Sequence, residues 1–569
     1  MTGVNRTLRV LPAVPLLLLA AACGPDEPSR ADSPPSFASP APLAPPAGDP
    51  AALAARAVAA MSDQDLAGEV LMPYAYGNSA TAVDGPSKAG NQKLAGVDTP
   101  AQMVARYHLG GLILVSFSAA DPTSTTNPTT NVDDPEQVRA LTDGLQAAAR
   151  ALPGGAPMMI GTDQEYGVVT RVTNGVTLLP SAMAAGAAGR PELTKAAWHA
   201  AGEELAAMGV TVDFAPDADT LGPPANTVIG SRSFGGDAKA NATQVAAAVA
   251  GLRSAGVTAG LKHFPGHGHT SGDSHETLPV VAQSHDAWTR QDLPPFQAGI
   301  TAGAGVVMSG HLDVPSLDKG VPATFSHKVM TDVLRGQLKF TGVAVTDAMN
   351  MPPAMKWPPG EAAVRALNAG NDMLLMPPDI GAARDGIVAA LKDGSLPRPR
   401  LVEAVTRVLT LNFRAAEQPR PGLSTVNTPA HQQAVSALDA ASITVLRGRC
   451  DGPLVDGPVT VSTQAVRATA RDNLTGALRD EGIPTGSGGT VIRLVGYGDK
   501  PSDLDPRADV TVMMDTPYLL SSARSGTLLA SYSSSKLSLK ALAAVLAGKA
   551  KATGRSPVAV AALPRTACG

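Results

Sequence analysis

The 569-residue sequence lacks the features of several large classes of protein. Aromatic residues make up only 3% of it, which is too few for the extended stacking surfaces that bind single-stranded nucleic acid. Its formal net charge of −4 leaves no basic or acidic excess for binding nucleic acid or another polyion. The hydrophobic share of 44% predicts a well-buried globular protein, and the length predicts two or three domains.

The apolar run at the N-terminus is too short to form a normal transmembrane helix. It covers residues 10–22, follows Arg6 and Arg9, and ends in small residues before Cys23, a pattern typical of a secretory signal. The residues before Cys23 resemble a lipobox, although Leu19 stands one place early, so we expect Cys23 to be lipidated after cleavage. A plain cleaved signal peptide is the alternative.

Residues 1–23 are therefore predicted to be a lipoprotein signal peptide. Residues 24–50, rich in Pro, Ala and Ser, are predicted to be a disordered tether. The predicted protein is exported and is anchored by its lipid to the extracytoplasmic face of the cell membrane. We expect it to be a monomer.

Cysteine is scarce, with three residues in the whole chain. Apart from Cys23, these are Cys450 and Cys568, at the two ends of the C-terminal region. In an oxidising compartment this pair can form a disulfide that closes the last domain. Two unrelated free thiols are the alternative.

Eight short apolar runs follow one another along the chain, separated by helical or loop segments. Their continuous apolar character suits strands buried on both faces of a parallel sheet. We therefore predict an α/β fold with a (β/α)8 TIM-type barrel over residues 51–418. An open doubly wound sheet is the alternative, but the first run is not followed by the glycine fingerprint of dinucleotide-binding folds. The runs are 68–74, 110–117, 157–163, 210–217, 257–264, 304–311, 342–347 and 372–377.

A proline-containing stretch at residues 420–429 ends the barrel in this interpretation. Beyond it, helical patterns at 466–481 and 535–549 accompany four strand-like segments, SITVLRG, PVTVST, TVIRLVGY and DVTVMMDTP. We predict that residues 419–569 form a smaller α/β layered C-terminal domain.

Polar residues stand at the C-terminal ends of the predicted barrel strands. In a barrel those ends form one rim, where active sites lie. The sequence therefore predicts a functional site on this rim. The residues are Asp163, Asp217, Lys262 with His263, His311, Asp347 and Asp379.

One rim segment, GLKHFPGHGHTSGDSHETLP, contains four of the ten histidines of the chain: His263, His267, His269 and His275. One hypothesis is a zinc site that combines the first three with Asp273 or His275. The spacing is not that of a His-x-x-x-His site on a helix, and no cysteine or acidic partner completes a recognised pattern, so we expect no metal. A second hypothesis is that His267 and His269 only hold the loop in shape.

A third hypothesis concerns Asp273-Ser274-His275. A carboxylate two residues from a histidine on an irregular loop can fix the tautomer of the ring and stabilise its protonated form. Because a histidine titrates near neutrality, it can act as general acid and then as general base in a two-step reaction.

Several motifs together resemble glycoside hydrolase family 3, in its β-N-acetylglucosaminidase (β-hexosaminidase) branch. The most specific is KHFPGHG at residues 262–268, followed by Asp273-Ser274-His275. The likeness covers residues 55–415, and the C-terminal part resembles the second domain of the family. With its lipobox, the chain resembles an actinobacterial-type lipoprotein of this branch. The other matching motifs are DQE at 163–165, IGSRSF at 229–234, TDAM at 346–349 and AGNDM at 369–373.

The resemblance implies a role for each matching residue. Asp347 is the implied nucleophile, which forms a covalent glycosyl-enzyme with retention of configuration. His275 is the implied acid/base, and Asp273 orients it. No cofactor is implied. The residues implied to hold the terminal sugar are Asp163, Arg171, Arg232, Lys262 and His263.

The sequence departs from the family pattern in three places. Tyr166-Gly167-Val168 replaces the usual Gly-Gly-Arg, so one arginine of the pocket is missing. Ala348 follows the implied nucleophile where a second aspartate is common. Residues 75–100 form a polar insertion after the first strand, placed to shape or cover the pocket.

We therefore predict an exo-acting, retaining glycosidase that releases terminal β-linked N-acetylglucosamine from cell-wall muropeptides or chito-oligosaccharides. Alternatives within the family are a β-glucosidase or β-xylosidase, whose acid/base usually comes from the second domain, and a phosphorylase that uses phosphate in place of water. The alternative outside enzymes is an envelope lipoprotein that binds sugar or metal without turnover. A pure binding protein has no need of both Asp347 and His275.

Overall fold

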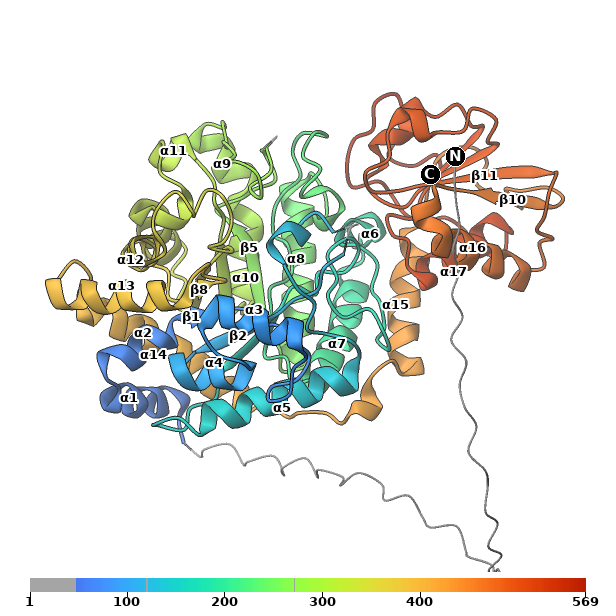
Figure 1. The fold of residues 1–569 in the computed structure, drawn as a ribbon. Coiled ribbons are helices and arrows are strands. Elements are labelled where there is room, and N and C mark those ends of the chain that lie inside the picture. Colours follow the sequence, from blue (N-terminus) through green and yellow to red (C-terminus); the bar gives the residue numbers. More distant parts are fainter. Residues whose placement is uncertain (1–47, 119–120, 271, 569) are drawn as a thin grey trace, which may run out of the picture. The chain divides into compact units, whose positions relative to one another are not determined.

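The computed structural model describes residues 48–118, 121–270 and 272–568, which belong to one compact unit (Figure 1). The predicted signal peptide, Cys23 and all but the end of the predicted tether lie outside the described residues. Within the described ranges, no helix has both the length and the apolar character that crossing a bilayer requires.

Eight parallel strands follow one another in sequence order, β2 to β7 as one sheet and β1 with β8 as a pair. The Ile113 N–H donates to Pro73 O at 3.0 Å, and the Thr346 N–H donates to Met373 O at 3.0 Å. These bonds join the pair to both edges of the sheet, so the predicted TIM-type barrel is confirmed and each strand lies within a predicted run. The strands are β1 (Leu71–Met72), β2 (Gly111–Leu114), β3 (Met159–Thr162), β4 (Val212–Asp213), β5 (Thr258–Phe264), β6 (Val306–Ser309), β7 (Val343–Thr346) and β8 (Leu374–Leu375).

The barrel strands are buried on both faces, as their unbroken apolar sequences require. In β2, Leu112 packs in the core between strands and helices, whereas Ile113 packs in the core inside the barrel. Gly161 on β3 faces this inner core, where an added Cβ would lie 2.5 Å from Met72 Cε and 2.8 Å from Phe214 Cε2. The interior is therefore filled by large side chains that leave room only for glycine at this position.

Helices surround the barrel and alternate with its strands (Figure 1). Short 3₁₀ turns, η1 (Ser124–Thr126), η2 (Gly230–Arg232) and η3 (Ala323–Phe325), and a π-helical segment, η4 (Lys328–Gln337), lie between them. The helices are α1 (Pro50–Ala60), α2 (Asp63–Glu69), α3 (Gly85–Ala95), α4 (Pro100–Tyr107), α5 (Pro135–Arg150), α6 (Ala182–Ala188), α7 (Pro191–Ala207), α8 (Ala238–Ser254), α9 (His285–Gln291), α10 (Leu293–Ala302), α11 (Pro315–Asp318), α12 (Pro359–Ala369), α13 (Ile380–Asp393) and α14 (Arg398–Ala416).

The predicted insertion at residues 75–100 contains α3, which packs against α4 and α13. Asn91 on α3 is buried and hydrogen-bonds the backbone N–H and C=O of Tyr76 and the C=O of Asp98. These bonds fix the start and end of the insertion to its helix, so the insertion is an ordered part of the outer helical layer.

The C-terminal half contains a five-stranded sheet in the order β10-β11-β12-β13-β9, in which only β9 runs antiparallel. Its strands are β9 (Thr444–Arg447), β10 (Val459–Ser462), β11 (Thr490–Val495), β12 (Val510–Met513) and β13 (Thr527–Ala530). β13 was not among the predicted strands, because its four residues stand in a serine-rich stretch. The helical elements are η5 (Leu423–Thr425), α15 (Pro429–Ser442), η6 (Ala465–Arg467), α16 (Ala468–Asp480), η7 (Pro501–Asp503), η8 (Pro517–Ser522) and α17 (Lys536–Leu546). This is the expected smaller α/β layer.

A disulfide joins Cys450, after β9, to Cys568, with a Cα–Cα distance of 5.4 Å across 118 positions of the chain. In the chain-entropy model, closing a loop of this length contributes about 4–5 kcal/mol to stability. The bond thus ties the final residues of the chain to the C-terminal sheet.

An apolar cluster lies between the barrel loops and the C-terminal sheet. It includes Met183 and Ala187 of α6 on one side and Tyr532 on the other. The Ser181 hydroxyl donates to Tyr532 O at 2.7 Å, and the Arg555 N–H donates to Ala187 O at 2.9 Å. Apolar burial and hydrogen bonds therefore both hold the sheet against the barrel.

Candidate active site

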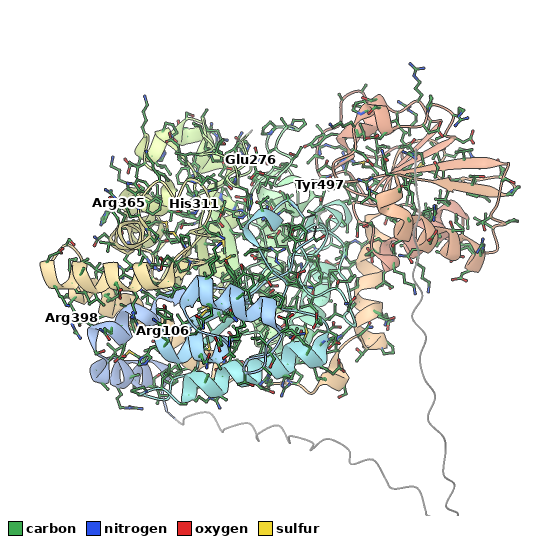
Figure 2. All side chains as sticks on the ribbon, in the orientation of Figure 1. Arg106, Glu276, His311, Arg365, Arg398 and Tyr497 are labelled. Atoms are coloured by element: carbon green, nitrogen blue, oxygen red, sulfur yellow. A yellow bond between two sulfur atoms is a disulfide. The ribbon has the colours of Figure 1, made fainter. Side chains whose placement is uncertain are left out.

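Polar side chains from the C-terminal ends of several barrel strands meet at one rim. Asp163 follows β3, Lys262 and His263 lie near the end of β5, and Asp347 follows β7. His311, labelled in Figure 2, follows β6. Asp379, the last of the predicted rim residues, is instead exposed and caps α13 by accepting the Ala382 N–H at 2.9 Å.

Alternating charges connect the residues predicted to hold the sugar. Lys262 Nζ lies 2.6 Å from Asp163 Oδ1 and 2.6 Å from Glu165 Oε1. Arg232 donates two hydrogen bonds to Glu165, from Nε to Oε2 at 2.7 Å and from Nη2 to Oε1 at 2.9 Å. Glu165 therefore bridges two cations that come from different elements, β5 and η2.

Arg171 extends this row beyond Asp163. Its Nη2 lies 3.4 Å from Asp163 Oδ2 and donates to Thr123 Oγ1 at 2.9 Å, and its Nη1 pairs with Asp121. The side chains of Arg171 and Asp121 are almost fully buried. Arg171 therefore lines one side of the site in a fixed position. It is held between the carboxylates of Asp121 and Asp163.

The network keeps its charges at neutral pH despite burial. Burial raises the pKa of Glu165, but Arg232 and Lys262 lower it by more, so it lies below the ordinary value. Burial lowers the pKa of Lys262, but Asp163 and Glu165 raise it above the ordinary value. The side chains of Lys262 and Glu165 are 3% exposed and that of Asp163 is 15% exposed, so Asp163 is the member most open to a ligand.

His263 is held in one tautomer by two partners. Its Nδ1–H donates to Asp219 Oδ2 at 2.8 Å, and its Nε2 lies 3.3 Å from Arg232 Nη2, which is always a donor. Burial and the charge of Arg232 lower the pKa of His263 to about 4, so the ring is neutral. Asp219 also accepts the backbone N–H of His263 at 3.2 Å and that of His267 at 2.6 Å, which anchors the start of the histidine loop.

Two of the loop histidines hold the loop in shape. The ring of His267 binds the hydroxyls of Thr270 at 2.9 Å and Ser274 at 3.0 Å. His269 Nδ1 lies 2.8 Å from Asp292 Oδ1. His267 and His269 therefore each have their own partners within the protein.

Asp273 and His275 form a pair on the same loop. The Nδ1–H and the backbone N–H of His275 both donate to Asp273 Oδ1 at 2.8 Å. Burial raises the pKa of Asp273, but the hydrogen bonds from His275 lower it below the ordinary value, so the carboxylate is ionised. Nε2 of His275 has no hydrogen-bond partner among the described residues, which leaves it free to exchange a proton with a ligand.

Asp347 keeps part of its surface accessible and accepts the Ala348 N–H on Oδ1 at 2.7 Å. Burial raises the pKa of Asp347, but three nearby imidazoles and the Ala348 N–H lower it below the ordinary value. The imidazoles are those of His263, His311 and His275. The site thus has an ionised carboxylate within electrostatic reach of a histidine whose Nε2 is free, a combination of nucleophile and acid/base that can serve group transfer through a covalent intermediate.

One group of possible metal ligands appears in the described part of the chain: Asp217, Asp219 and His263, whose ligand atoms lie within 4.8 Å of one another. Arg232 Nη2 lies 3.7 Å from Asp217 Oδ2. Because this guanidinium already supplies positive charge beside the group, the donor set does not fit a divalent cation. That no metal is needed stays a prediction.

At the first departure from the family pattern, Tyr166 is buried and packs edge-on against Trp198, with ring centroids 5.8 Å apart. The segment therefore supplies core packing in place of an arginine. Arg171, five residues after Tyr166, is a cation that reaches Asp163, as Lys262 also does.

Five residues that the structure places here received no individual role from the sequence, although His311 was among the predicted rim residues. Glu165 was visible in the DQE motif, and His311 at a strand end, but their partners were not. Asp219 stands two residues beyond Asp217, and no pattern marked Asp121 or Thr123, which lie in the long loop after β2. The five residues are Glu165, His311, Asp219, Asp121 and Thr123.

The chain is similar in sequence to known glycosidases. The profile of the glycosyl hydrolase family 3 N-terminal domain matches residues 88–411, more than half of the chain. β-Hexosaminidase A of Pseudoalteromonas piscicida is 33% identical over 390 residues, which are 63% of this chain and 63% of that protein. A β-hexosaminidase of Mycobacterium tuberculosis is 32% identical over 330 residues, 56% of this chain and 78% of that protein. The chain thus spans less than two thirds of the Pseudoalteromonas relative.

The fold is also similar to that of a solved structure, a glycoside hydrolase family 3 β-N-acetylglucosaminidase from Paenibacillus sp. str. FPU-7. The TM-score is 0.76 at 29% identity, and the match covers 88% of this chain and 99% of that one. Because so much of the chain is covered, the similarity extends beyond the barrel into the C-terminal sheet.

Replacing Glu165 with Gln is expected to destabilise the protein, because it leaves two buried cations without their shared carboxylate. The expected cost at pH 7 is about 3–5 kcal/mol, measured by urea unfolding. Glu361→Gln breaks an exposed i,i+4 pair with Arg365 and is the control, with an expected cost of about 0.3–0.5 kcal/mol.

The effect of Glu165 has a defined pH dependence. Its folded pKa lies below the ordinary 4.5, so its charge stabilises the fold above that pH and the contribution is lost as the pH falls. The difference between wild type and Glu165→Gln should therefore shrink on acidification. A difference that does not change with pH, or one equal to that of Glu361→Gln, would contradict the bridging role.

Proposed function

The chain belongs to glycosyl hydrolase family 3, and on this premise we propose that it is a retaining, exo-acting β-N-acetylhexosaminidase that releases terminal β-linked N-acetylglucosamine. The main support is the arrangement of an ionised Asp347 close to a histidine, His275, whose Nδ1 is held by Asp273 and whose Nε2 is free. The β-hexosaminidases to which the chain is similar support the choice of sugar.

In the first step, an Asp347 oxygen attacks the anomeric carbon of the terminal sugar while the glycosidic bond breaks. Protonated His275 gives its Nε2 proton to the departing oxygen, so the leaving sugar departs as a neutral alcohol. Asp273 stabilises the imidazolium before this transfer, because its carboxylate lies 2.8 Å from Nδ1. The product is a glycosyl ester on Asp347 and a neutral His275.

In the second step, the neutral Nε2 of His275 takes a proton from a water molecule, whose oxygen attacks the anomeric carbon. The ester bond to Asp347 breaks and the carboxylate is restored. Two displacements at the same carbon return the original configuration, so the enzyme is a retaining one. One histidine serves as acid and then as base.

The proposed pocket for the terminal sugar lies along the row of alternating charges. Asp163 is open enough to accept hydroxyl hydrogen bonds, and Lys262 Nζ has a third N–H beyond its two ion pairs. Arg171, Arg232 and His263 hold these groups in position and border the same space. The chemistry that we propose needs no metal or organic cofactor.

We further propose that the substrates are GlcNAc-terminated muropeptides or chito-oligosaccharides at the cell envelope. The support lies in the sequence before the described residues, where a signal and Cys23 resemble those of lipoproteins. Lipidation of Cys23 would place the enzyme on the extracytoplasmic face of the membrane.

Replacing Asp347 with Asn is expected to abolish GlcNAc release. The purified protein should cleave 4-nitrophenyl β-GlcNAc in preference to the β-glucoside, with the same rate in EDTA, and Asp347→Asn should lower kcat by about 10³-fold or more. Asp379→Asn, which changes a rim carboxylate that only caps α13, is the control and should behave as wild type. Wild-type protein that releases neither sugar, with or without phosphate, would exclude the glycosidase function.

Replacing His275 with Ala is expected to act selectively on poor leaving groups, because only these need a proton to depart. The value of kcat/KM should fall about 10²–10⁴-fold for N,N′-diacetylchitobiose and about tenfold or less for the nitrophenyl substrate. His269→Ala removes a histidine of the same loop that binds Asp292, and both values should then fall in parallel or not at all. Equal losses for the two substrates in His275→Ala would refute the acid role.

A further inference from the structure

The ends of β11 and β12 lie against the loop that contains Arg232. Val495, the last residue of β11, and Met513, the last of β12, belong to the same apolar cluster as Val228 and Ile229. Arg232 is the third residue after Ile229 and the last of η2. The loops that follow these two strands are therefore brought to the edge of the candidate active site.

Polar contacts fix this junction. Ser231 lies near Asp515, which follows β12 and is buried, and its hydroxyl offsets part of the rise that burial causes in the pKa of that carboxyl. A Cβ added to Gly230, which has a φ of 45°, would lie in van der Waals contact with Thr516 Cγ2 at 3.5 Å. The loop after β12 thus contacts the residues directly before Arg232.

The neighbouring loop, after β11, contains Tyr497 and is held rigidly. Arg467 donates from Nη2 to the Tyr497 C=O and from Nη1 to Asp499 Oδ1, the latter at 2.8 Å. Asp499 Oδ2 accepts the Gly496 N–H at 2.8 Å. One arginine and one aspartate therefore fix the backbone on both sides of Tyr497.

The side chain of Tyr497, labelled in Figure 2, is half-buried, and its hydroxyl has no hydrogen-bond partner within the described residues. Burial raises the pKa of Tyr497; the charges of Asp515, Asp273 and Asp121 raise it further, and that of Arg232 lowers it. Asp273, Arg232 and Asp121 all belong to the candidate active site. The neutral phenol of Tyr497 is thus within electrostatic reach of this site, and its hydroxyl is unpaired among the described residues.

The position relative to Asp273 indicates which part of a substrate the phenol meets. Asp273 holds His275, and in the proposed function His275 protonates the oxygen of the leaving group. The charge of Asp273 acts on Tyr497 more strongly than that of Asp121, which pairs with Arg171, so the phenol is nearer the leaving-group side than the terminal sugar along Asp163 and Lys262. A tyrosine suits a sugar there, because its ring packs on apolar C–H faces while its hydroxyl hydrogen-bonds.

We propose that Tyr497 binds the leaving-group sugar of the substrate and so makes the C-terminal domain part of the specificity of the enzyme. This inference rests on the proposed glycosidase function. It assigns Tyr497 to recognition of the leaving saccharide and gives it no part in proton transfer. The ligand class is a pyranose attached through its oxygen to the terminal N-acetylglucosamine.

The test compares binding on the two sides of the scissile bond in Tyr497→Ala and Tyr497→Phe. For Tyr497→Ala, KM for N,N′-diacetylchitobiose should rise about tenfold, equivalent to 1.4 kcal/mol, with kcat changed less than about threefold. The inhibition constant of free GlcNAc, which reports the terminal-sugar pocket, should stay unchanged. Tyr497→Phe keeps the ring and should give a smaller rise in KM, so the proposal stays testable if the Ala variant is unstable.

The matched control is Tyr518→Ala, which removes a partly buried tyrosine of the same domain from η8. It should leave both constants at wild-type values. An unchanged KM for chitobiose in both Tyr497 variants, or a rise in the GlcNAc inhibition constant by the same factor, would overturn the proposal. Wild-type protein that releases no GlcNAc would instead refute the proposed function, so the two failures are distinguishable.

Discussion

The carboxylate of Glu165 lies between two buried cations, Lys262 at 2.6 Å and Arg232 at 2.7 Å, and much of the site depends on this contact. Lys262 comes from β5 and leads directly into the histidine loop, whereas Arg232 ends η2, on which the C-terminal sheet rests. Removing charges from water is costly, and these charges are kept only because each faces an opposite charge. One carboxylate therefore connects three segments that are far apart in the sequence. These are its own loop after β3, the end of β5 and the turn η2.

The same low-dielectric surroundings explain how two groups with opposite tasks remain ready at one pH. Asp347 must be ionised to attack, and the surrounding imidazoles and a backbone N–H favour that state over the effect of burial. His275 must gain and lose a proton, and Asp273 stabilises its protonated form. Because the acid is an imidazole, it adds no second negative charge beside the nucleophile. Such a charge would raise the pKa of Asp347 and oppose its ionisation.

The barrel and its rim were predictable because their signals are local. An unbroken apolar run such as 304–311 indicates a strand buried on both faces, and a polar residue at its end indicates the rim. The partners of these residues were not predictable, because Asp121 pairs with Arg171 across 50 residues of chain and Glu165 pairs with Arg232 across 67. β13 was missed because four residues among serines give too little pattern.

The most direct test of the whole account is to trap the covalent intermediate. His275→Ala should form the glycosyl ester with 4-nitrophenyl β-GlcNAc but hydrolyse it slowly, since the base is missing. After an acid quench and digestion, mass spectrometry should find one GlcNAc on the peptide that contains Asp347, and none in the His275→Ala/Asp347→Asn double variant. A sugar attached to another residue, or turnover by wild type that inverts the anomeric configuration, would contradict the account.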